Sequence, residues 1–140
     1  MQTLLGLILT FVFVTLAGIH FYWGLGGKWG LEGAIPITAN SVKARNPGII
    51  ACFAVGLAIG FVAFFVLIKA DLVTFSMPTF VSNYGLLILS GVFLLRAIGD
   101  FKYAGFTKKI HQGLFASNDT KYYSPLCLLI SLALFFLNYL

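Results

Sequence analysis

Long apolar stretches alternate with short polar ones along the chain, and the length of the apolar stretches indicates the fold class. A helix needs about 20 apolar residues to cross a hydrocarbon core of roughly 30 Å. Four stretches approach this length, at residues 3–22, 48–68, 80–99 and 125–140. Pro47, Pro78 and Pro125 lie at or just before the starts of three of them, where the missing N–H of proline breaks no helical hydrogen bond. The pattern predicts an all-α fold, a bundle of four transmembrane helices that forms one membrane domain over residues 1–140.

The composition favours lipid over water as the solvent around these stretches. Hydrophobic residues make up 60% of the chain and charged residues 9%, whereas roughly a quarter of the residues of a soluble domain are charged. A water-soluble globule of this composition would have too few polar groups to cover its surface. The net charge of +5 lies in short loops between apolar helices. It therefore indicates topology and contact with anionic lipid rather than binding of nucleic acid.

The connections between the predicted spans differ in length and in charge. The two long loops, residues 24–47 and 100–123, must lie on the same side of the membrane. All of the nine lysines and arginines except Lys69 belong to that side, including Lys43 and Arg45. The positive-inside rule therefore predicts that both loops are cytoplasmic and both termini are outside.

Small residues recur at every fourth position near the start of the second span. Helices in lipid associate where small side chains let their backbones approach closely. We therefore expect a helix-packing face made of Gly48, Cys52, Gly56 and Gly60. Packing within the bundle is the favoured interpretation, and a homodimer seam is the alternative.

The two halves of the chain show a weak internal similarity. Residues 20–24 align with residues 100–104, and Lys28 then aligns with Lys108. This alignment predicts two tandem helical-hairpin repeats related by an axis along the membrane normal. The alternative is the general likeness of any two membrane hairpins with aromatic residues at their ends.

The unusual polar residues gather at the cytoplasmic ends of the predicted helices, where ionisable groups are costly unless they are paired or hydrated. Arg96 and Asp100 are four residues apart, so an ion pair on one helix face is expected. The alternative is that Arg96 clamps a phosphate or carboxylate while Asp100 orients it. Residues 101–115 interleave aromatic rings with lysines and predict a segment lying on the membrane surface.

His20 is the one histidine inside a predicted span, and it fits either a hydrogen-bonded interface residue or a functional base. Cys52 and Cys127 lie at a similar depth, but equal depth does not establish proximity, so no metal site and no cofactor is predicted. The sequence also lacks an HExxH motif, a CxxC pair and a Ser-His-Asp order. No catalytic residue is therefore assigned.

Three motifs in order resemble a known family. They are His20-x-x-Trp23 with residues 26–31, residues 96–103, and Asp119-Thr120 with residues 123–126. Together they resemble domain of unknown function 3995, a bacterial family of four-helix integral membrane proteins without an assigned activity. The resemblance implies a multi-pass protein of the bacterial inner membrane and supplies no reaction.

The favoured function is a non-catalytic module or accessory subunit that binds a lipid headgroup or a small anion on its cytoplasmic face. A membrane enzyme acting on a lipid or isoprenoid headgroup and a small dimeric transporter are the alternatives. Anionic membrane lipids are the expected partners, with a homodimer or a larger membrane complex as a further expectation. The candidate ligand-binding residues are His20, Trp23, Lys28, Trp29, Arg96, Asp100, Tyr103, Asp119 and Tyr123.

Overall fold

The computed structural model describes residues 1–36 and 47–140, and this part of the chain is helical with no strand. The long helices are α1 (Gln2–Gly24), α3 (Ile49–Lys69), α4 (Thr79–Ile98) and α6 (Ser124–Tyr139). Shorter elements are α2 (Leu31–Ala34), α5 (Gly113–Asn118) and the π-helical turn η1 (Asp119–Tyr123). Four helical segments have the length and composition of membrane spans, namely α1, α3, α4 and the continuous run Gly113–Tyr139. The predicted all-α four-helix fold is confirmed.

The first three helices begin and end within two residues of the predicted spans, whereas the fourth begins earlier. α5, η1 and α6 follow one another without a break, so helix starts at Gly113 inside the predicted loop 100–123. Pro125 lies in the first turn of α6, directly after the π-helical turn. Proline cannot donate a hydrogen bond within a helix, and the π-helical turn changes the hydrogen-bond register just before it. The chain therefore passes Pro125 without ending the helix. Residues 37–46 of the predicted loop 24–47, with Lys43 and Arg45, lie outside the described residues.

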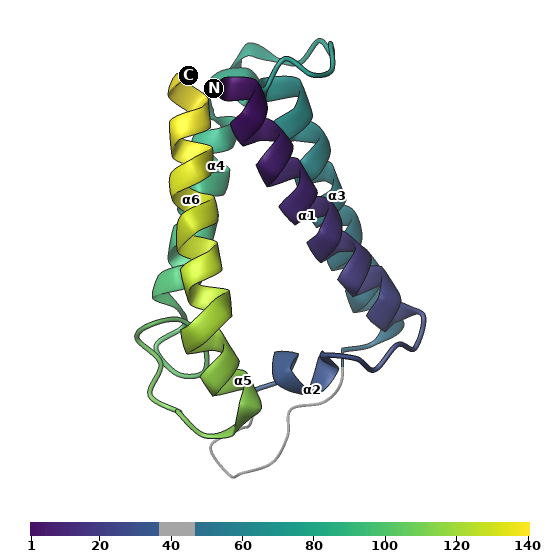
Figure 1. The fold of residues 1–140 in the computed structure, drawn as a ribbon, viewed down its shortest axis with the longest axis vertical. Coiled ribbons are helices and arrows are strands. Elements are labelled where there is room, and N and C mark those ends of the chain that lie inside the picture. The colour runs from purple at the N-terminus through teal and green to yellow at the C-terminus, as the bar shows by residue number, and fades with distance from the viewer. Residues whose placement is uncertain (37–46) are drawn as a thin grey trace.

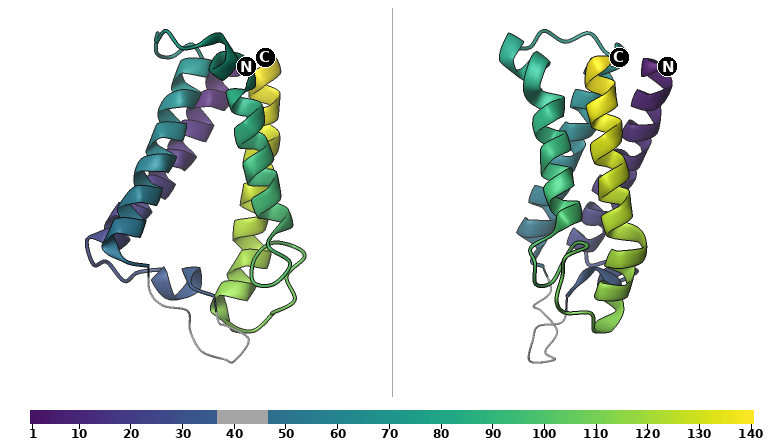
Figure 2. Two further views of the ribbon diagram at one scale, coloured as in Figure 1. Left: turned by 180° about the vertical axis from the view of Figure 1, so that it is seen from behind. Right: turned by 90° about the vertical axis from the view of Figure 1, so that its left-hand side faces the viewer.

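The long helices form two pairs that converge at one end of the molecule. α1 packs along α3 and α4 packs along α6, and the pairs meet at the end that carries both termini (Figure 1). Toward the opposite end the pairs diverge, and α2 and α5 contact each other there (Figure 2). The described parts of the two long connections lie at this opposite end, which we call the loop end. The expectation that they share one end of the bundle is met.

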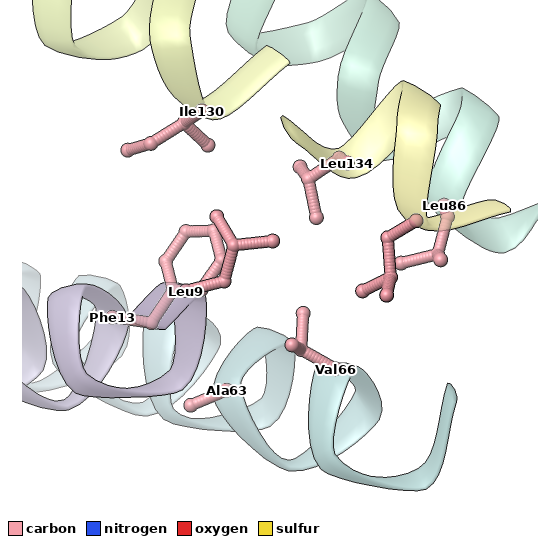
Figure 3. Close-up of a cluster of buried hydrophobic side chains, with 8 residues drawn as sticks. Leu9, Phe13, Ala63, Val66, Leu86, Ile130 and Leu134 are labelled. Atoms are coloured by element: carbon pink, nitrogen blue, oxygen red, sulfur yellow. The ribbon is translucent and has the colours of Figure 1, made fainter. Parts of the chain in front are cut away.

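The hydrophobic core joins all four long helices in the half of the bundle near the termini. Figure 3 shows its side chains meeting between the two pairs; the cluster is Leu9, Phe13, Ala63, Val66, Leu86, Ile130, Leu134 and Leu137. Large apolar side chains also cover the outer faces, such as Phe11 and Phe61, which are 74% and 72% exposed. Such an apolar exterior would be unfavourable in water and is the surface that lipid solvates.

Close contact of α1 and α3 depends on small residues. A Cβ on Gly56 would lie 2.8 Å from the Phe21 ring, and one on Gly6 would overlap the side chain of Ala70. Cys52, four residues before Gly56 in α3, is also buried. A Cβ on Gly48 or Gly60 would meet nothing within 4 Å. Only part of the predicted small-residue face therefore approaches α1.

Two serines join α4 and α6 through hydrogen bonds. Ser90 Oγ donates to the Ser131 carbonyl oxygen at 2.9 Å, and Ser131 Oγ donates to the Ser90 carbonyl oxygen at 2.8 Å. Both residues are buried within the spans, where no water competes for these hydrogen bonds. The sequence pattern gave no sign of this pair because a single serine in an apolar run has no periodic signature.

The order of elements repeats along the chain. Each half contains a long helix, a short helix and a second long helix, and the two short helices contact each other across the loop end. This order matches the predicted tandem hairpin repeat. A common origin of the two halves stays a prediction.

Candidate functional site

Asp119 is the centre of a buried polar network at the loop end. Its side chain is 0% exposed, and Oδ1 accepts a hydrogen bond from Arg96 Nη2 at 2.9 Å. Oδ2 accepts from Lys108 Nζ at 3.0 Å, from the Gly105 N–H at 2.8 Å and from Ser124 Oγ at 3.1 Å. A carboxylate offers about four acceptor positions, and donors from four residues fill them. Asp119 therefore joins α4, α6 and the loop between α4 and α5.

Lys108 is as fully satisfied as Asp119. Besides Asp119, its Nζ donates to Thr120 Oγ1 at 2.7 Å and to the Gly105 carbonyl oxygen at 3.1 Å. An ammonium group has three protons, and each has an acceptor here. The side chain is only 1% exposed. The expectation that Lys108 meets lipid from a surface segment is wrong, because the lysine compensates a buried carboxylate.

Asp100 organises the loop that carries Lys108. Its Oδ1 accepts hydrogen bonds from the N–H groups of Lys102 at 2.9 Å, Tyr103 at 2.6 Å and Ala104 at 2.9 Å. Slight burial raises the pKa of Asp100, but the hydrogen bonds from Ala104, Lys102 and Tyr103 outweigh it and hold the pKa below its usual value. The ionised side chain therefore fixes residues 100–104 as a compact turn.

The expected ion pair between Arg96 and Asp100 does not form. α4 ends at Ile98, and Gly99 has φ 99°, so Asp100 leaves the helix before the four-residue spacing can apply. A Cβ on Gly99 would overlap the Ala104 carbonyl oxygen, so only glycine allows the loop to fold back this closely. Arg96 pairs instead with Asp119, and its Nη1 is buried with no hydrogen-bond partner among the described residues. Asp100 thus cannot orient Arg96 toward a ligand in this arrangement.

A second polar region lies where the short helix α2 packs against α5 and η1. Tyr123 Oη donates to the Gly33 carbonyl oxygen at 3.1 Å. A Cβ on Gly33 would overlap Asn118 Nδ2, so the absence of a side chain lets α2 approach this closely. The rings of Phe115 and Tyr123 pack with their centroids 6.1 Å apart. These contacts fix α2, from the first half of the chain, against the second half.

A hollow of about 530 Å³ opens beside this contact, and we call it the α2–α5 hollow. Both halves of the chain supply its walls, and it combines a cation, a carboxylate, an amide and a phenol with apolar side chains. Its lining residues are Lys28, Gly30, Leu31, Glu32, Gly33, Ile35, Leu114, Asn118 and Tyr123.

His20 and Trp23 line a neighbouring, mainly apolar hollow of about 290 Å³ together with Cys52. His20 Nδ1 lies 2.8 Å from the Leu16 carbonyl oxygen. A carbonyl can only accept, so Nδ1 carries the proton of this hydrogen bond. Cys127 lines no part of this hollow, so His20, Cys52 and Cys127 do not form one cluster. Within residues 1–36 and 47–140, no group of three His, Cys, Asp or Glu side chains could hold a metal ion.

Trp23 also contacts Trp29, and Trp29 and Tyr103 are the remaining candidates. Trp23 Nε1 donates to the Trp29 carbonyl oxygen at 2.9 Å, which folds the loop after α1 back onto that helix, and the Trp29 ring is 76% exposed. The ammonium group of Lys102 lies 5.1 Å from the centre of the half-buried Tyr103 ring. Exposed tryptophan beside lysine is typical of the headgroup layer.

The structure therefore distributes the nine candidate residues over separate places. Lys28 and Tyr123 share the α2–α5 hollow, while Arg96 and Asp119 form the buried network. Sequence reasoning missed Asn118, Ser124 and the buried role of Lys108. Asn118 and Ser124 flank the noted Asp119 and Tyr123, and Ser124 also lies in the family motif at residues 123–126.

These features define a class of protein, a multi-pass membrane protein of four apolar helices with a network of ion pairs around a buried carboxylate at one end. The model of the family described as protein of unknown function DUF3995 matches residues 13–134, and the chain belongs to that family. No curated protein and no solved structure matches the sequence.

Proposed function

We propose that this membrane protein binds the headgroup of an anionic lipid in the α2–α5 hollow, without transforming it. The observation that carries the proposal is the composition of the hollow, whose lining includes Lys28, Asn118 and Tyr123. Ammonium and amide N–H groups donate to phosphate oxygens, whereas the proton of the Tyr123 hydroxyl is already donated to the Gly33 carbonyl oxygen. Leu31, Ile35 and Leu114 complete a wall suited to the less polar part of a lipid.

The other cations near the Asp119 network support Lys28 as the ligand-binding charge. Arg96 and Lys108 both donate to Asp119, which already compensates their charge. No ion pair engages Lys28 within the part of the chain that the structure describes, and the residue is exposed. Lys28 therefore meets an incoming headgroup without competition from a carboxylate that already pairs with it.

The same geometry favours binding over catalysis. The two aspartates that were candidates for the site, Asp100 and Asp119, accept three and four hydrogen bonds from the protein, so the protein's own donors hold both carboxylates in place. Glu32 also lines the hollow. Its negative charge disfavours an anion with several charges and is compatible with a headgroup that carries one.

We place the loop end in the cytoplasm and both termini outside, since the lysines and arginines gather at the loop end. The cytoplasmic leaflet carries most of the anionic lipid of a membrane, which concentrates the proposed ligand at this face.

The test is native mass spectrometry of the purified protein with equal amounts of phosphatidylglycerol, phosphatidylethanolamine and phosphatidylcholine. We expect preferential retention of phosphatidylglycerol, and a loss of about tenfold in its bound fraction for Lys28→Gln, because one charge-assisted hydrogen bond is removed. Lys109→Gln is the matched control, because Lys109 is an exposed lysine of the loop end that does not line the hollow. Equal retention of the three lipids, or equal loss in both variants, would refute the proposal.

A further inference from the structure

The α2–α5 hollow adjoins the apolar hollow that His20 and Trp23 line. Leu31 and Ile35 line both of them, so these two side chains form a wall that the two spaces share. Figure 1 shows α2 crossing the loop end between the two diverging helix pairs. One elongated molecule that extends past these two side chains would occupy both hollows.

The two hollows differ in chemistry and in depth. Lys28 and Glu32 of the first lie in the connection after α1, outside the spans. The second is walled by residues within α1 and α3, on the membrane side of α2; these include His20, Trp23, Ala51, Cys52 and Val55. Polar surface outside the spans thus lies next to mainly apolar surface at the ends of α1 and α3.

Two polar groups of the apolar hollow, His20 Nδ1 and the Cys52 thiol, have partners inside the protein. The proton on His20 Nδ1 is donated to the Leu16 carbonyl oxygen, and the imidazole packs edge-on against Trp23 with centroids 5.2 Å apart. The Cys52 thiol faces the Pro47 carbonyl oxygen at 4.0 Å. The hollow therefore presents mainly hydrocarbon and an aromatic ring to an occupant, which favours an apolar one.

We infer that the two hollows hold one amphiphile, with its anionic headgroup in the α2–α5 hollow and one hydrocarbon chain in the apolar hollow. This inference rests on the proposed function and narrows its ligand to a chain-bearing lipid, excluding a free anion of the same charge. α2 then lies between head and chain, and the hydrogen bond from Tyr123 to the Gly33 carbonyl oxygen holds it there.

The test fills the apolar hollow without touching the headgroup contacts. Ala51→Trp introduces a large side chain into the wall of the apolar hollow. Ala54→Trp is the matched control, because Ala54 is an exposed alanine of the same helix that lines neither hollow. Retention of phosphatidylglycerol is measured by native mass spectrometry, with chain-free glycerol 3-phosphate added as a competitor.

We expect Ala51→Trp to lower the retained fraction about tenfold relative to Ala54→Trp, and glycerol 3-phosphate to displace little lipid, because burial of the chain supplies much of the binding free energy. If Ala51→Trp lowers the thermal unfolding midpoint in detergent, the smaller Ala51→Leu takes its place and a partial loss is expected.

The outcomes separate this inference from the proposed function. Retention by Ala51→Trp equal to that of the control, with Lys28→Gln still defective, would overturn the chain site and leave the headgroup site standing. Displacement of the lipid by an equal concentration of glycerol 3-phosphate would also overturn the chain site. Retention unaffected by both Ala51→Trp and Lys28→Gln would overturn both proposals.

Discussion

Two polar regions lie at the loop end, and they differ in how completely their polar groups are satisfied. In the Asp119 network, one buried carboxylate accepts hydrogen bonds from four residues, and the buried Lys108 donates to three acceptors. In the α2–α5 hollow, Lys28 and Asn118 border about 530 Å³ of open space. The first region is closed by its own contacts and the second is open to a partner.

The comparison teaches that charge at the membrane surface is a poor guide to binding unless its partners are known. Leaving a buried charge unpaired is strongly destabilising, so a folded protein satisfies its most deeply placed charges with its own groups. Arg96, Asp100 and Asp119 attract attention in the sequence because they are ionisable and close to a span. The structure uses these three side chains to shape the loop that follows α4.

The largest effect on stability is expected for Asp119→Ala. This change leaves Lys108 buried without a counter-charge and removes the acceptor of the Gly105 N–H. We expect the free energy of unfolding to fall by about 3–5 kcal/mol, because one member of a buried ion pair is lost. Thermal or denaturant unfolding in a fixed detergent measures the change.

The double variant Asp119→Ala with Lys108→Met sharpens this result. It removes both the carboxylate and the buried ammonium, so it should recover part of the stability lost by the single change. A double variant no more stable than Asp119→Ala would show that the network is not held together by charge compensation.

The fold could be predicted largely from the sequence because its determinants are long-range and simple. Apolar length predicts the four spans, and loop length with charge predicts which connections share an end. α6 begins at Ser124, one residue before the predicted start of the fourth span, but the π-helical turn from Asp119 to Tyr123 joins it to α5 in one continuous helical run that the sequence did not predict. Such a turn depends on tertiary contacts and has no clear local signature.

The candidate site could be predicted less well, for a physical reason that Lys108 illustrates. Its neighbours in sequence are polar and aromatic, as in a surface segment, yet the fold of residues 99–105 brings it inside to Asp119. Lys28 was correctly placed at the loop end, but its hollow depends on the contact between α2 and α5. Pairings between residues about ninety positions apart, such as Gly33 with Tyr123, leave no pattern in a single sequence.

A medium-sized effect on stability is expected from loss of the hydrogen bond that holds α2 beside the α2–α5 hollow. Tyr123→Phe removes the hydrogen bond to the Gly33 carbonyl oxygen and keeps the ring packed near Phe115. We expect a loss of about 1 kcal/mol in the free energy of unfolding, the usual net value of one neutral hydrogen bond. If the hollow is a binding site, lipid retention should fall more steeply than stability does. Tyr122→Phe, at an exposed neighbouring tyrosine, serves as the control, and equal retention in both variants would show that the Tyr123 hydroxyl does not shape the hollow.

The smallest effect on stability is expected from a change at Asp100. This change also tests whether the loop that carries Lys108 into the Asp119 network depends on the charge of Asp100. The carboxylate form accepts the backbone N–H groups of residues 102–104, and the pKa of Asp100 lies below its usual value of 3.8. A lowered pKa in the folded state means that the ionised form stabilises the fold above the usual pKa, and that this contribution is lost as the pH falls through the lower, folded-state pKa.

Asp100→Asn keeps an acceptor oxygen without the charge, so it should unfold at a slightly lower temperature than the wild type at neutral pH. The difference between the two should disappear in acid below the folded-state pKa, even though protonation of Asp119 destabilises both proteins there. A difference in unfolding midpoint that stays constant from neutral pH into that acid range would show that the charge of Asp100 does not hold the loop, and that its hydrogen bonds act as neutral ones.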